Sequence, residues 1–512
     1  MSTQSGDPET QPGRRPPEGT QAVQRALTLL ERLRSGPGTL AEIADGEGLA
    51  RPTAHRLLAA LESRRLVERR GILYAAGPAL AEWGARSLHA RPGSWPEPSP
   101  LHPRQVLANQ STSWTDWSGF AMPASYERSH HREYWAVRGS AGLFDVSALY
   151  KYDFVGEGAA ALAQRLLTRD VARCRVGQVM YGCWCDDQGD VLQDGNLWRL
   201  AEDHFRISAA EPCLRWFEDC SFGIAGVEVQ EVSRQIAALA LQGPRSRAIL
   251  EQALETSLAD LGFFRGARLD WRGGELGITR TGYTGDLGYE LWVDSRRALE
   301  LWDDLCRAGA DHAMLPAGLQ ALDATRIEAG LVLLDVDYFS ADHALTESRK
   351  STPFDLGLGW AVQLNDGNDF VGRAALERRP RNWTVCGVEI DWSELERLHR
   401  PRGVRPLTVG GVPDRRPVPL RRGGRQVGQI TSQCFSPLLK RQIGIASVQL
   451  DALADDDGDG PVDASALAGR RVEVWLDIER ERIPATARLC ALPHYDPPQK
   501  RQRFDRPAGA RR

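Results

Sequence analysis

The stretch TLAEIADGEGLARPTAHRLLAALESRRLVER, residues 39–69, predicts two helices joined by a tight turn. Thr39 and Glu42 form a capping box, in which the hydroxyl and the carboxylate each satisfy a backbone N–H group that a helix start leaves without a partner. A short helix over residues 40–46 follows this box. Gly48 permits the sharp turn after it, because glycine tolerates positive φ.

Three further features extend this stretch into a winged helix-turn-helix domain. The second helix starts at Pro52, a residue favoured in the first helical turn, and runs to about Ser63. Residues 21–34 place alanine and leucine at helical spacing and predict a preceding helix. Residues 66–77, LVERRGILYAAG, alternate as a small hairpin does. Three helices and a hairpin predict a mainly α, winged helix-turn-helix domain over residues 19–90.

The charge of this domain indicates a polyanionic partner. The whole chain has a formal net charge of −4, yet residues 51–70 hold six arginines against two glutamates. Residues at the start of a recognition helix reach base edges, and residues in a wing contact phosphates. We therefore expect double-stranded DNA as the partner, and a homodimer if the target is a palindrome. The expected DNA-binding residues are Arg51, Thr53, His55 and Arg56 in the helix and Arg69 and Arg70 in the wing.

A protein-docking or dimerisation domain with a solvated basic face has the same pattern. Basic helix-turn-helix units serve both purposes, so the pattern by itself leaves the two interpretations open. Salt-sensitive and sequence-selective binding to DNA distinguishes them.

The rest of the chain divides by composition into tails, a linker and two more domains. No run of about 18 apolar residues occurs, so the sequence predicts no membrane helix. The N-terminal residues lack the apolar core of a secretory signal, and we expect a cytoplasmic protein. Mixed strands and amphipathic helices predict an α+β body, and short strands after about residue 385 predict a small β-barrel. The expected segments are a disordered 1–18, a proline-rich linker 91–103, the α+β body 104–380, the barrel 381–497 and a basic tail 498–512.

Cysteine and acidic residues form no recognisable disulfide or metal pattern. Nine cysteines lie at irregular spacings without a CxxC motif, and the CWC at 183–185 is typical of one face of a strand. The acidic run DDDGDG at 455–460 resembles the start of a calcium loop, but Ala466 stands where such a loop needs a glutamate. The sequence therefore predicts no metal site.

The stretch RTGYTGDLGYEL, residues 280–291, is a glycine-rich turn between two strands of the body. Gly282, Gly285 and Gly288 allow positive φ or a close approach of the backbone to a ligand. Glu290, near the start of the second strand, could pair with a flat heterocycle that offers two adjacent N–H donors, as a pterin does. An ordinary hairpin with an exposed glutamate fits the same residues.

A second candidate lies in MYGCWCDDQGDVLQDGNLWRL, residues 180–200, where a Gln-Gly turn joins two strands. Asp194 stands in the second strand among apolar neighbours, with no lysine or arginine beside it. A half-buried carboxylate is costly unless it has a partner or a chemical role. A capping or turn aspartate is the alternative.

The N-terminal segments resemble the DNA-binding domain of the isocitrate-lyase-regulator (IclR) family over about residues 20–90. The resemblance implies double-stranded DNA as the partner. It ends there, because the GAF-like effector domain that follows in that family is absent, and the sequence assigns no sensor. The segments that carry the resemblance are VQRALTLLERL, TLAEIADGEGLARPTAHRLLAALESRRLVER and YAAGPALAEWG.

The remaining chain, over about residues 101–490, resembles the glycine-cleavage T-protein family. That family contains aminomethyltransferases and relatives that move a methyl or methylene group to tetrahydrofolate, on a folate-binding α+β body with a C-terminal barrel. The resemblance implies tetrahydrofolate as cofactor and a small-molecule one-carbon donor. The segments that carry it are WSGFAMPASY, REYWAVRGSAGLFDVS, ALALQGPRSRAIL, RTGYTGDLGYELWV, LPAGLQALDATRIEAGL, GLGWAVQL and GQITSQCFSPLLKRQIGIASV.

The resemblance also implies roles for four residues. Asp194 corresponds to the family's catalytic aspartate, and Tyr181 to the tyrosine upstream of it. Glu290 corresponds to the glutamate that binds the pterin, and Tyr283 to the tyrosine of the Gly-Tyr-Thr-Gly motif. Tyr181, Tyr283 and Glu290 are therefore the expected cofactor-binding residues.

Three departures from the family pattern leave the reaction open. Leu322 stands where aminomethyltransferases carry an arginine, and residues 208–210 read Ser-Ala-Ala where the family has Ser-Asn-Ala. Residues 340–344 read SADHA in place of the family's usual Gly-x-Asp-Ile segment. One hypothesis is a tetrahydrofolate-dependent aminomethyl- or methyltransferase, of the demethylase type, fused to a DNA-binding domain. The alternative is a transcriptional regulator that uses a catalytically silent folate-family domain as its ligand sensor.

Overall fold

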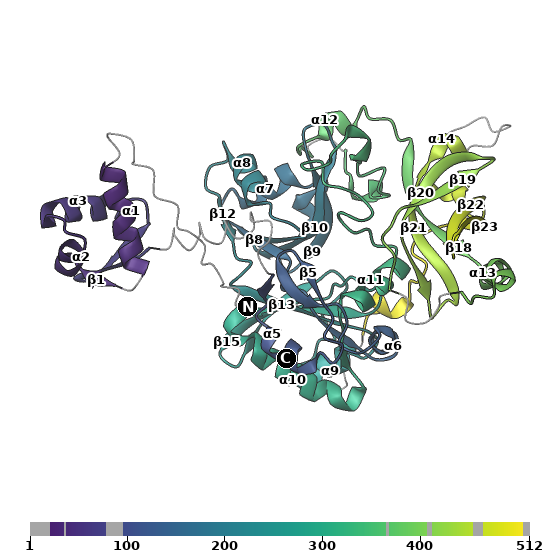
Figure 1. Cartoon of the computed structure of the whole chain (residues 1–512), viewed down its shortest axis with the longest axis horizontal. Coiled ribbons are helices and arrows are strands. Elements are labelled where there is room, and N and C mark those ends of the chain that lie inside the picture. The colour runs from purple at the N-terminus through teal and green to yellow at the C-terminus, as the bar shows by residue number, and fades with distance from the viewer. Residues whose placement is uncertain are drawn as a thin grey trace, which may run out of the picture. The chain divides into compact units, whose positions relative to one another are not determined.

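The computed structural model describes residues 21–34, 37–77, 96–364, 368–406, 412–453 and 464–504. They form two compact units, one before residue 96 and one from Pro96 onward (Figure 1). The predicted disordered segment 1–18 and the acidic run 455–460 lie outside the described residues. Within the described ranges, no helix combines the length and the apolarity that crossing a bilayer requires.

The first unit has the element order that the sequence predicts. The capping box is present: the Glu42 amide donates to Thr39 Oγ1 at 3.3 Å, and the Thr39 amide donates to Glu42 Oε2 at 2.8 Å. Gly71, at φ +65°, turns the predicted hairpin. The sheet has a third strand that the sequence did not predict, because it is only two residues long. The elements are α1 (Gln21–Arg34), β1 (Gly38–Thr39), α2 (Leu40–Gly46), α3 (Arg51–Glu62), β2 (Val67–Arg70) and β3 (Leu73–Ala76), with strand order β1-β3-β2.

The second unit begins inside the predicted linker 91–103, so that prediction is wrong in its second half. Glu97–Pro98 forms strand β4, and Ser99 is buried with its hydroxyl donating to Asp145 Oδ2 at 2.6 Å. Helix α5, His102–Ala108, follows with proline in its first turn. The proline-rich composition misled the prediction, because proline is tolerated both in edge strands and at helix starts. A small sheet in the order β4-β6-β5 includes β5 (Trp114–Trp117) and β6 (Phe120–Pro123).

Two sheets form the α+β body. In one, helices α7 and α8 pack on the outer face around a core that includes Trp184 and Phe217. In the other, helices α9 and α10 pack on the outer face around a core that includes Leu291 and Trp302. The first sheet, in the order β12-β8-β11-β10-β9, and its helices comprise β8 (Tyr150–Val155), α7 (Ala159–Leu166), β9 (Val179–Cys185), β10 (Val191–Ala201), β11 (His204–Ala209), α8 (Leu214–Ser221) and β12 (Glu228–Glu231).

The second sheet has the order β14-β15-β16-β13-β7-β17. A further apolar cluster, with Phe144, Trp198 and Trp292, joins residues of both sheets and therefore lies between them. The elements of the second sheet and its helices are α6 (His131–Gly139), β7 (Gly142–Asp145), β13 (Ile236–Gln242), α9 (Ser246–Leu254), β14 (Gly266–Trp271), β15 (Gly274–Thr279), β16 (Gly288–Asp294), α10 (Ala298–Gly309), β17 (Leu315–Pro316) and α11 (Leu319–Glu328).

The predicted β-barrel is present and closed, with six strands in the order β18-β21-β20-β19-β22-β23. Helix α13, Trp392–His399, was not predicted and follows the first strand. Helix α11 of the body lies against strands β20 and β21 (Figure 1). The barrel elements are β18 (Trp383–Ile390), β19 (Val418–Arg422), β20 (Arg425–Ser436), β21 (Arg441–Gln449), α14 (Leu450–Leu453), β22 (Arg471–Ile478) and β23 (Glu481–Cys490), and α12 (Arg373–Leu376) precedes them.

A buried ion cluster joins this barrel to the body. Glu328, at the end of α11, accepts two hydrogen bonds from Arg138 at 2.6 and 2.9 Å and one from the Tyr134 hydroxyl at 2.6 Å. The Ser436 hydroxyl of β20 donates to the same carboxylate. Because Arg138 and Glu328 are almost fully buried, each depends on the other for its charge balance.

The predicted basic tail 498–512 is folded at its start. The buried Arg280 guanidinium donates to the carbonyl oxygens of Gln499, Lys500 and Gln502, at 3.3, 3.1 and 2.8 Å. Phe504 packs against the core of the second sheet. The basic composition did not reveal that this segment is folded. Its backbone carbonyl groups, and not its side-chain charges, fix the segment to the body.

Candidate functional site

Asp194 lies on β10 and is held by two phenols. Tyr181 on β9 donates its hydroxyl to Asp194 Oδ2 at 2.8 Å, and the Tyr338 hydroxyl donates to Oδ1. Burial raises the pKa of Asp194 above its usual value, whereas the two phenol hydrogen bonds lower it. Both carboxylate oxygens are thus committed to fixed donors, and the position of the charge is set by the protein.

Tyr338 is the functional candidate that the sequence analysis missed. It comes 144 positions after Asp194, in a loop with no regular element and no recognised motif. Its neighbour Asp337 is fixed by the buried Arg326 of α11 and accepts hydrogen bonds from the hydroxyls of Thr431 and Ser432. This anchor joins the barrel, α11 and the loop, and so it places Tyr338 against Asp194.

Trp360 adds an aromatic surface beside this pair. Its ring stacks on the Tyr181 ring, with centroids 5.8 Å apart and planes at 20°, and the residue is 60% exposed. The Arg169 guanidinium lies 5.5 Å from the same ring. A flat apolar face in this position can stack with a ring of a ligand.

Glu290 lies on β16, in the facing sheet, and its hydrogen bonds are one-sided. The Thr281 hydroxyl donates to Oε2, and the Thr279 hydroxyl reaches the same oxygen at 3.5 Å. Among the described residues, no hydrogen bond reaches Oε1. Burial raises the pKa of Glu290, and the two threonine hydroxyls lower it.

A narrow slot between the two sheets connects Glu290 with the Asp194 strand. Asn196 and Trp198 of β10 line it on one side, and Glu290 and Trp292 on the other. Asn196 and Asp194 are two residues apart on one strand and so share its face. The Asn196 Oδ1 atom is buried and accepts no hydrogen bond from any residue that the structure describes. Little open space remains between the indoles, so a planar ring enters only if an indole turns away.

The glycines of the 280–291 turn serve the protein's own packing. Gly285 turns the chain at φ +78°, as expected. A Cβ on Gly282 or on Gly288 would collide with the side chain of Gln242, so these two glycines make room for that residue and not for a ligand. Tyr283 donates its hydroxyl to the Val332 carbonyl.

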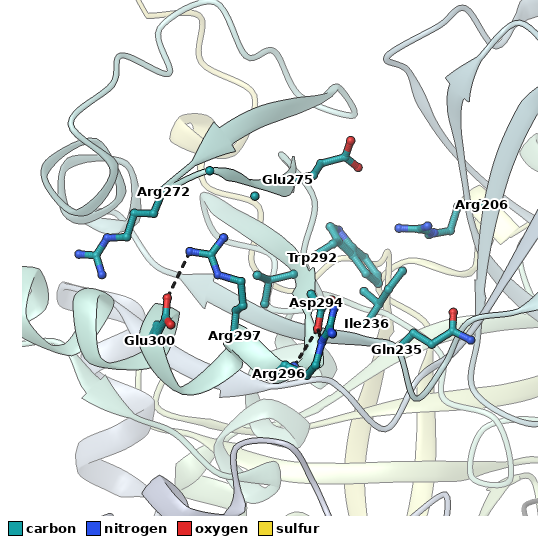
Figure 2. A pocket seen from close by; sticks show the side chains of 13 residues that line it. Arg206, Gln235, Ile236, Arg272, Glu275, Trp292, Asp294, Arg296, Arg297 and Glu300 are labelled. Carbon is teal, nitrogen blue, oxygen red and sulfur yellow. Dashed lines mark hydrogen bonds and ion pairs between the residues drawn. The ribbon is translucent and has the colours of Figure 1, made fainter. Parts of the chain in front are cut away.

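A wider pocket opens next to the slot, since Arg206 and Trp292 line both (Figure 2). Four arginines line it, but each is paired with a carboxylate, which weakens the pocket as an anion site. The pairs are Arg206 with Asp153 at 2.7 Å, Arg272 with Asp304 at 2.8 Å, Arg296 with Asp294 at 2.5 Å and Arg297 with Glu300 at 3.2 Å.

The predicted DNA-contacting side chains lie on the open face of α3 and in the sheet of the first unit. Arg51, His55 and Arg56 are exposed and Thr53 is half-buried, while Ala54 and Leu58 face the core. Arg69 is exposed on β2, with Nε donating to the Gly71 carbonyl at 3.0 Å. The side chain of Arg70 lies outside the described residues, although its backbone pairs with Leu73.

The chain thus combines a helix-turn-helix unit, a two-sheet body and a closed barrel. Three family models match these parts. Residues 104–366 match the GCVT N-terminal domain, residues 405–496 the glycine cleavage T-protein C-terminal barrel domain, and residues 22–71 the IclR helix-turn-helix domain. The chain belongs to the glycine-cleavage T-protein family and carries an IclR-type helix-turn-helix domain before it.

Individual relatives agree with this assignment. An aminomethyltransferase of Halothermothrix orenii is 35% identical over 66% of this chain and 87% of its own length. A trimethylamine-oxide aldolase of Ruegeria pomeroyi is 33% identical over 72% of this chain, which spans 44% of that protein. The crystal structure of the glycine cleavage system aminomethyltransferase T from Bartonella henselae has the same fold, with a TM-score of 0.64 at 24% identity over 80% of this chain and all of that one.

Proposed function

We propose that this protein is a tetrahydrofolate-dependent one-carbon transferase whose N-terminal domain binds double-stranded DNA. One observation carries the first part: the buried Glu290 borders a slot whose opposite side is Asn196, two residues from the half-buried Asp194 on the same strand, and the two carboxylates have different hydrogen-bonding states. Asp194 is fully engaged by phenols, and Glu290 keeps one oxygen without a partner among the described residues.

The acceptor atoms that border the slot suit a reduced pterin, which would enter once one of the two indoles turns away. Glu290 Oε1 and Asn196 Oδ1 belong to residues that line one slot, and neither atom has a donor within the described ranges. The edge of a pterin presents adjacent N–H donors that such acceptors can bind. Glu290 would accept these hydrogen bonds and so orient the ring. A heterocycle without two adjacent N–H donors would bind less well. A bound tetrahydrofolate supplies the nitrogens that accept the one-carbon unit.

Asp194 is the residue that we assign to the transfer itself. Its fixed negative charge stabilises positive charge that develops on the transferred carbon, and its oxygens can hold the proton of the accepting nitrogen. Tyr181 and Tyr338 keep this charge in position. The donor is an aminomethyl or N-methyl compound, the classes that the names of the aminomethyltransferase and aldolase relatives suggest.

Anaerobic titration of tetrahydrofolate into the full chain tests the proposal, with Glu290→Gln and Asp194→Asn beside the natural protein. Saturable binding that Glu290→Gln weakens and Asp194→Asn retains supports a folate site with separate binding and transfer residues. Absence of binding to the natural protein overturns it. Product analysis with a panel of aminomethyl and N-methyl donors then identifies the reaction.

DNA binding is supported by the exposed basic side chains of α3 and by the family match of residues 22–71. Selection from a random duplex library is expected to enrich one sequence, with affinity that falls steeply as salt rises. Arg56→Ala is expected to lose that affinity, while Arg215→Ala, an exposed arginine of α8, is expected to retain it. Equal affinity for all sequences contradicts DNA reading.

The regulator alternative differs in one outcome. A silent sensor binds tetrahydrofolate, changes the DNA affinity on binding it, and turns over none of the donors. The exposed side chains of α3 favour this second function as well. If this helix binds DNA, a ligand bound elsewhere in the same chain can change the DNA affinity and so regulate transcription. Folate-dependent product formation decides for the enzyme.

A further inference from the structure

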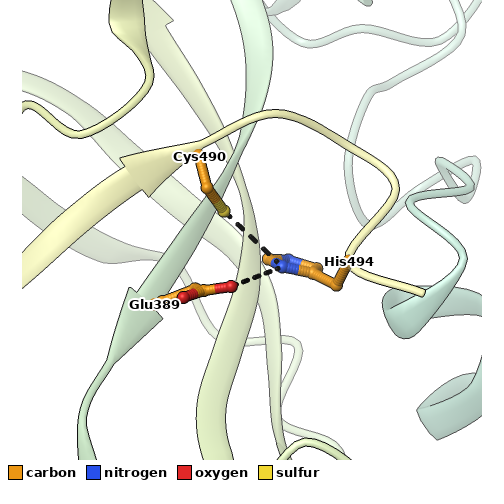
Figure 3. A group of neighbouring side chains, drawn as sticks. All are labelled: Glu389, Cys490 and His494. Carbon is orange, nitrogen blue, oxygen red and sulfur yellow. Dashed lines mark hydrogen bonds and ion pairs between the residues drawn. The ribbon is translucent and has the colours of Figure 1, made fainter.

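Three side chains of the barrel region converge on one point that the proposed transfer does not use. Glu389 comes from β18, Cys490 is the last residue of β23, and His494 follows four positions later (Figure 3). Cys490 Sγ lies 3.6 Å from His494 Nδ1, and Glu389 Oε1 lies 3.7 Å from the same nitrogen. All three potential ligand atoms lie within 4.8 Å of one another.

The imidazole is oriented as a metal ligand. His494 Nε2 lies 3.1 Å from the carbonyl oxygen of Gly444, which can only accept a hydrogen bond. In the neutral ring, Nε2 therefore carries the hydrogen and Nδ1 presents its lone pair to Cys490 and Glu389. A backbone carbonyl on the remote nitrogen is the usual way in which proteins fix a ligating histidine.

The distances suit one tetrahedral ion. Bond lengths of about 2.3 Å to sulfur and about 2.0 Å to nitrogen and oxygen give tetrahedral edges of about 3.5 Å for S···N and about 3.3 Å for N···O. The Cys490–His494 separation of 3.6 Å is close to the first value, and the Glu389–His494 separation of 3.7 Å needs a small rotation of the carboxylate to reach the second.

The surrounding residues leave room for the three ligands and orient one of them. Gly387 is paired with Cys490 across β18 and β23, and a Cβ there would lie 2.6 Å from the cysteine sulfur and 2.7 Å from His494 Cε1. Arg441 donates to Glu389 Oε2 at 2.7 Å, which turns Oε1 toward the imidazole.

We propose that Glu389 Oε1, Cys490 Sγ and His494 Nδ1 bind one Zn²⁺, with a fourth position open to water. A thiolate and an imidazole select zinc over magnesium or calcium, and Cys490 releases its proton to solvent when the ion binds. A Cys-His-acid catalytic relay does not fit, because thiol and carboxylate face the same ring nitrogen and such a relay needs one on each.

Zinc at this site strengthens the connection between the barrel and the body. It fastens the end of β23 to the segment that returns to the body, where the Tyr495 amide donates to the Glu328 carbonyl at 2.8 Å. The ion therefore has a structural effect and lies outside the Asp194 and Glu290 site.

The test uses the purified full chain, stripped with a chelator, loaded with zinc and freed of excess metal. Elemental analysis is expected to give one zinc per chain, and at least a tenfold lower content in Cys490→Ser and in His494→Ala. Cys306→Ser and His312→Ala, which lie outside this cluster, are matched controls that keep full content. Zinc below a tenth of an equivalent in the natural protein, or a full equivalent that persists in both variants, overturns the proposal.

Cobalt substitution of the natural protein keeps the test valid if a variant fails to fold. Co²⁺ in the site is expected to give a thiolate-to-metal charge-transfer band and to protect Cys490 from alkylation in peptide mapping. A cobalt-loaded protein without that band, with Cys490 alkylated as fast as in the stripped protein, contradicts cysteine ligation.

Discussion

Asp194, which is half-buried, and Glu290, which is buried, are carboxylates on facing sheets, and their hydrogen-bond partners differ in one respect. Asp194 receives a phenol on each oxygen, from Tyr181 and Tyr338, which come from different parts of the fold. Glu290 receives two threonine hydroxyls on one oxygen. The first arrangement holds a charge in place, and the second leaves an acceptor for something that is not part of the chain.

The physical reason is the cost of a buried charge. A carboxylate in an apolar slot is tolerated when its lone pairs are satisfied, and each missing donor raises its pKa. Burial raises the pKa of both groups here, against the hydroxyls that lower it. In the proposed function, a ligand with N–H groups would complete the set around Glu290, whereas both oxygens of Asp194 already have donors within the chain.

The largest expected effect is that of Asp194→Asn on turnover. Loss of the fixed charge is expected to lower kcat by about 100- to 10,000-fold, while tetrahydrofolate affinity stays within about threefold. Single-turnover product formation and anaerobic titration measure the two quantities. Asp187→Asn, on the exposed turn before β10, is the control. Turnover that survives Asp194→Asn would remove this carboxylate from the transfer step.

Glu290→Gln is expected to have the opposite profile. Replacing a charge-assisted acceptor by a neutral amide is expected to weaken tetrahydrofolate binding by about 10- to 100-fold, with kcat at saturation much less affected. Isothermal titration gives the affinity, and Glu228→Gln on β12 is an exposed control. If Glu290→Gln and Asp194→Asn both lower kcat and leave the tetrahydrofolate affinity unchanged, the two carboxylates do not have separate roles.

Tyr338→Phe tests the closed hydrogen-bond set at Asp194. Removing one phenol is expected to raise the pKa of Asp194 further, since that hydrogen bond lowers it. The anionic fraction of Asp194 then falls at a given pH, and the acidic limb of the kcat profile moves to higher pH. At pH values on that limb, kcat is expected to be about tenfold lower than in the natural protein.

Tyr289→Phe is the control for this substitution, because its buried hydroxyl has no hydrogen-bond partner in the part of the chain that the structure describes. Rates across pH for both variants decide the point. An unshifted limb in Tyr338→Phe would mean that Tyr181 alone sets the ionisation of Asp194.

The same contrast explains which parts of the site the sequence predicts. Asp194 and Glu290 stand within local strand and turn motifs that left their roles open, and the family resemblance singled them out before the fold was known. Tyr338 could not, because it reaches Asp194 only through the anchor of Asp337 to Arg326. Glu389 and Cys490 escaped for the same reason, since about a hundred positions separate them in the chain.

Composition was the weaker guide. Proline at 96–103 and basic residues at 498–504 suggested a linker and a basic tail, yet both segments are folded through backbone contacts that composition does not encode. By contrast, the capping box at Thr39 and the alternating strands of the barrel were predicted, because local hydrogen bonding and side-chain periodicity determine them.

The smallest expected effect comes from Thr281→Val, which removes a hydroxyl from Glu290 and keeps the shape of the side chain. The pKa of Glu290 is expected to rise further, because the Thr281 hydrogen bond lowers it. Tetrahydrofolate affinity is expected to fall by about threefold near neutral pH and more at lower pH. The exposed Thr346→Val serves as the control. Affinity that falls equally at every pH would indicate that Thr281 positions the glutamate without tuning its charge, and the contrast with Asp194 would then be one of geometry alone.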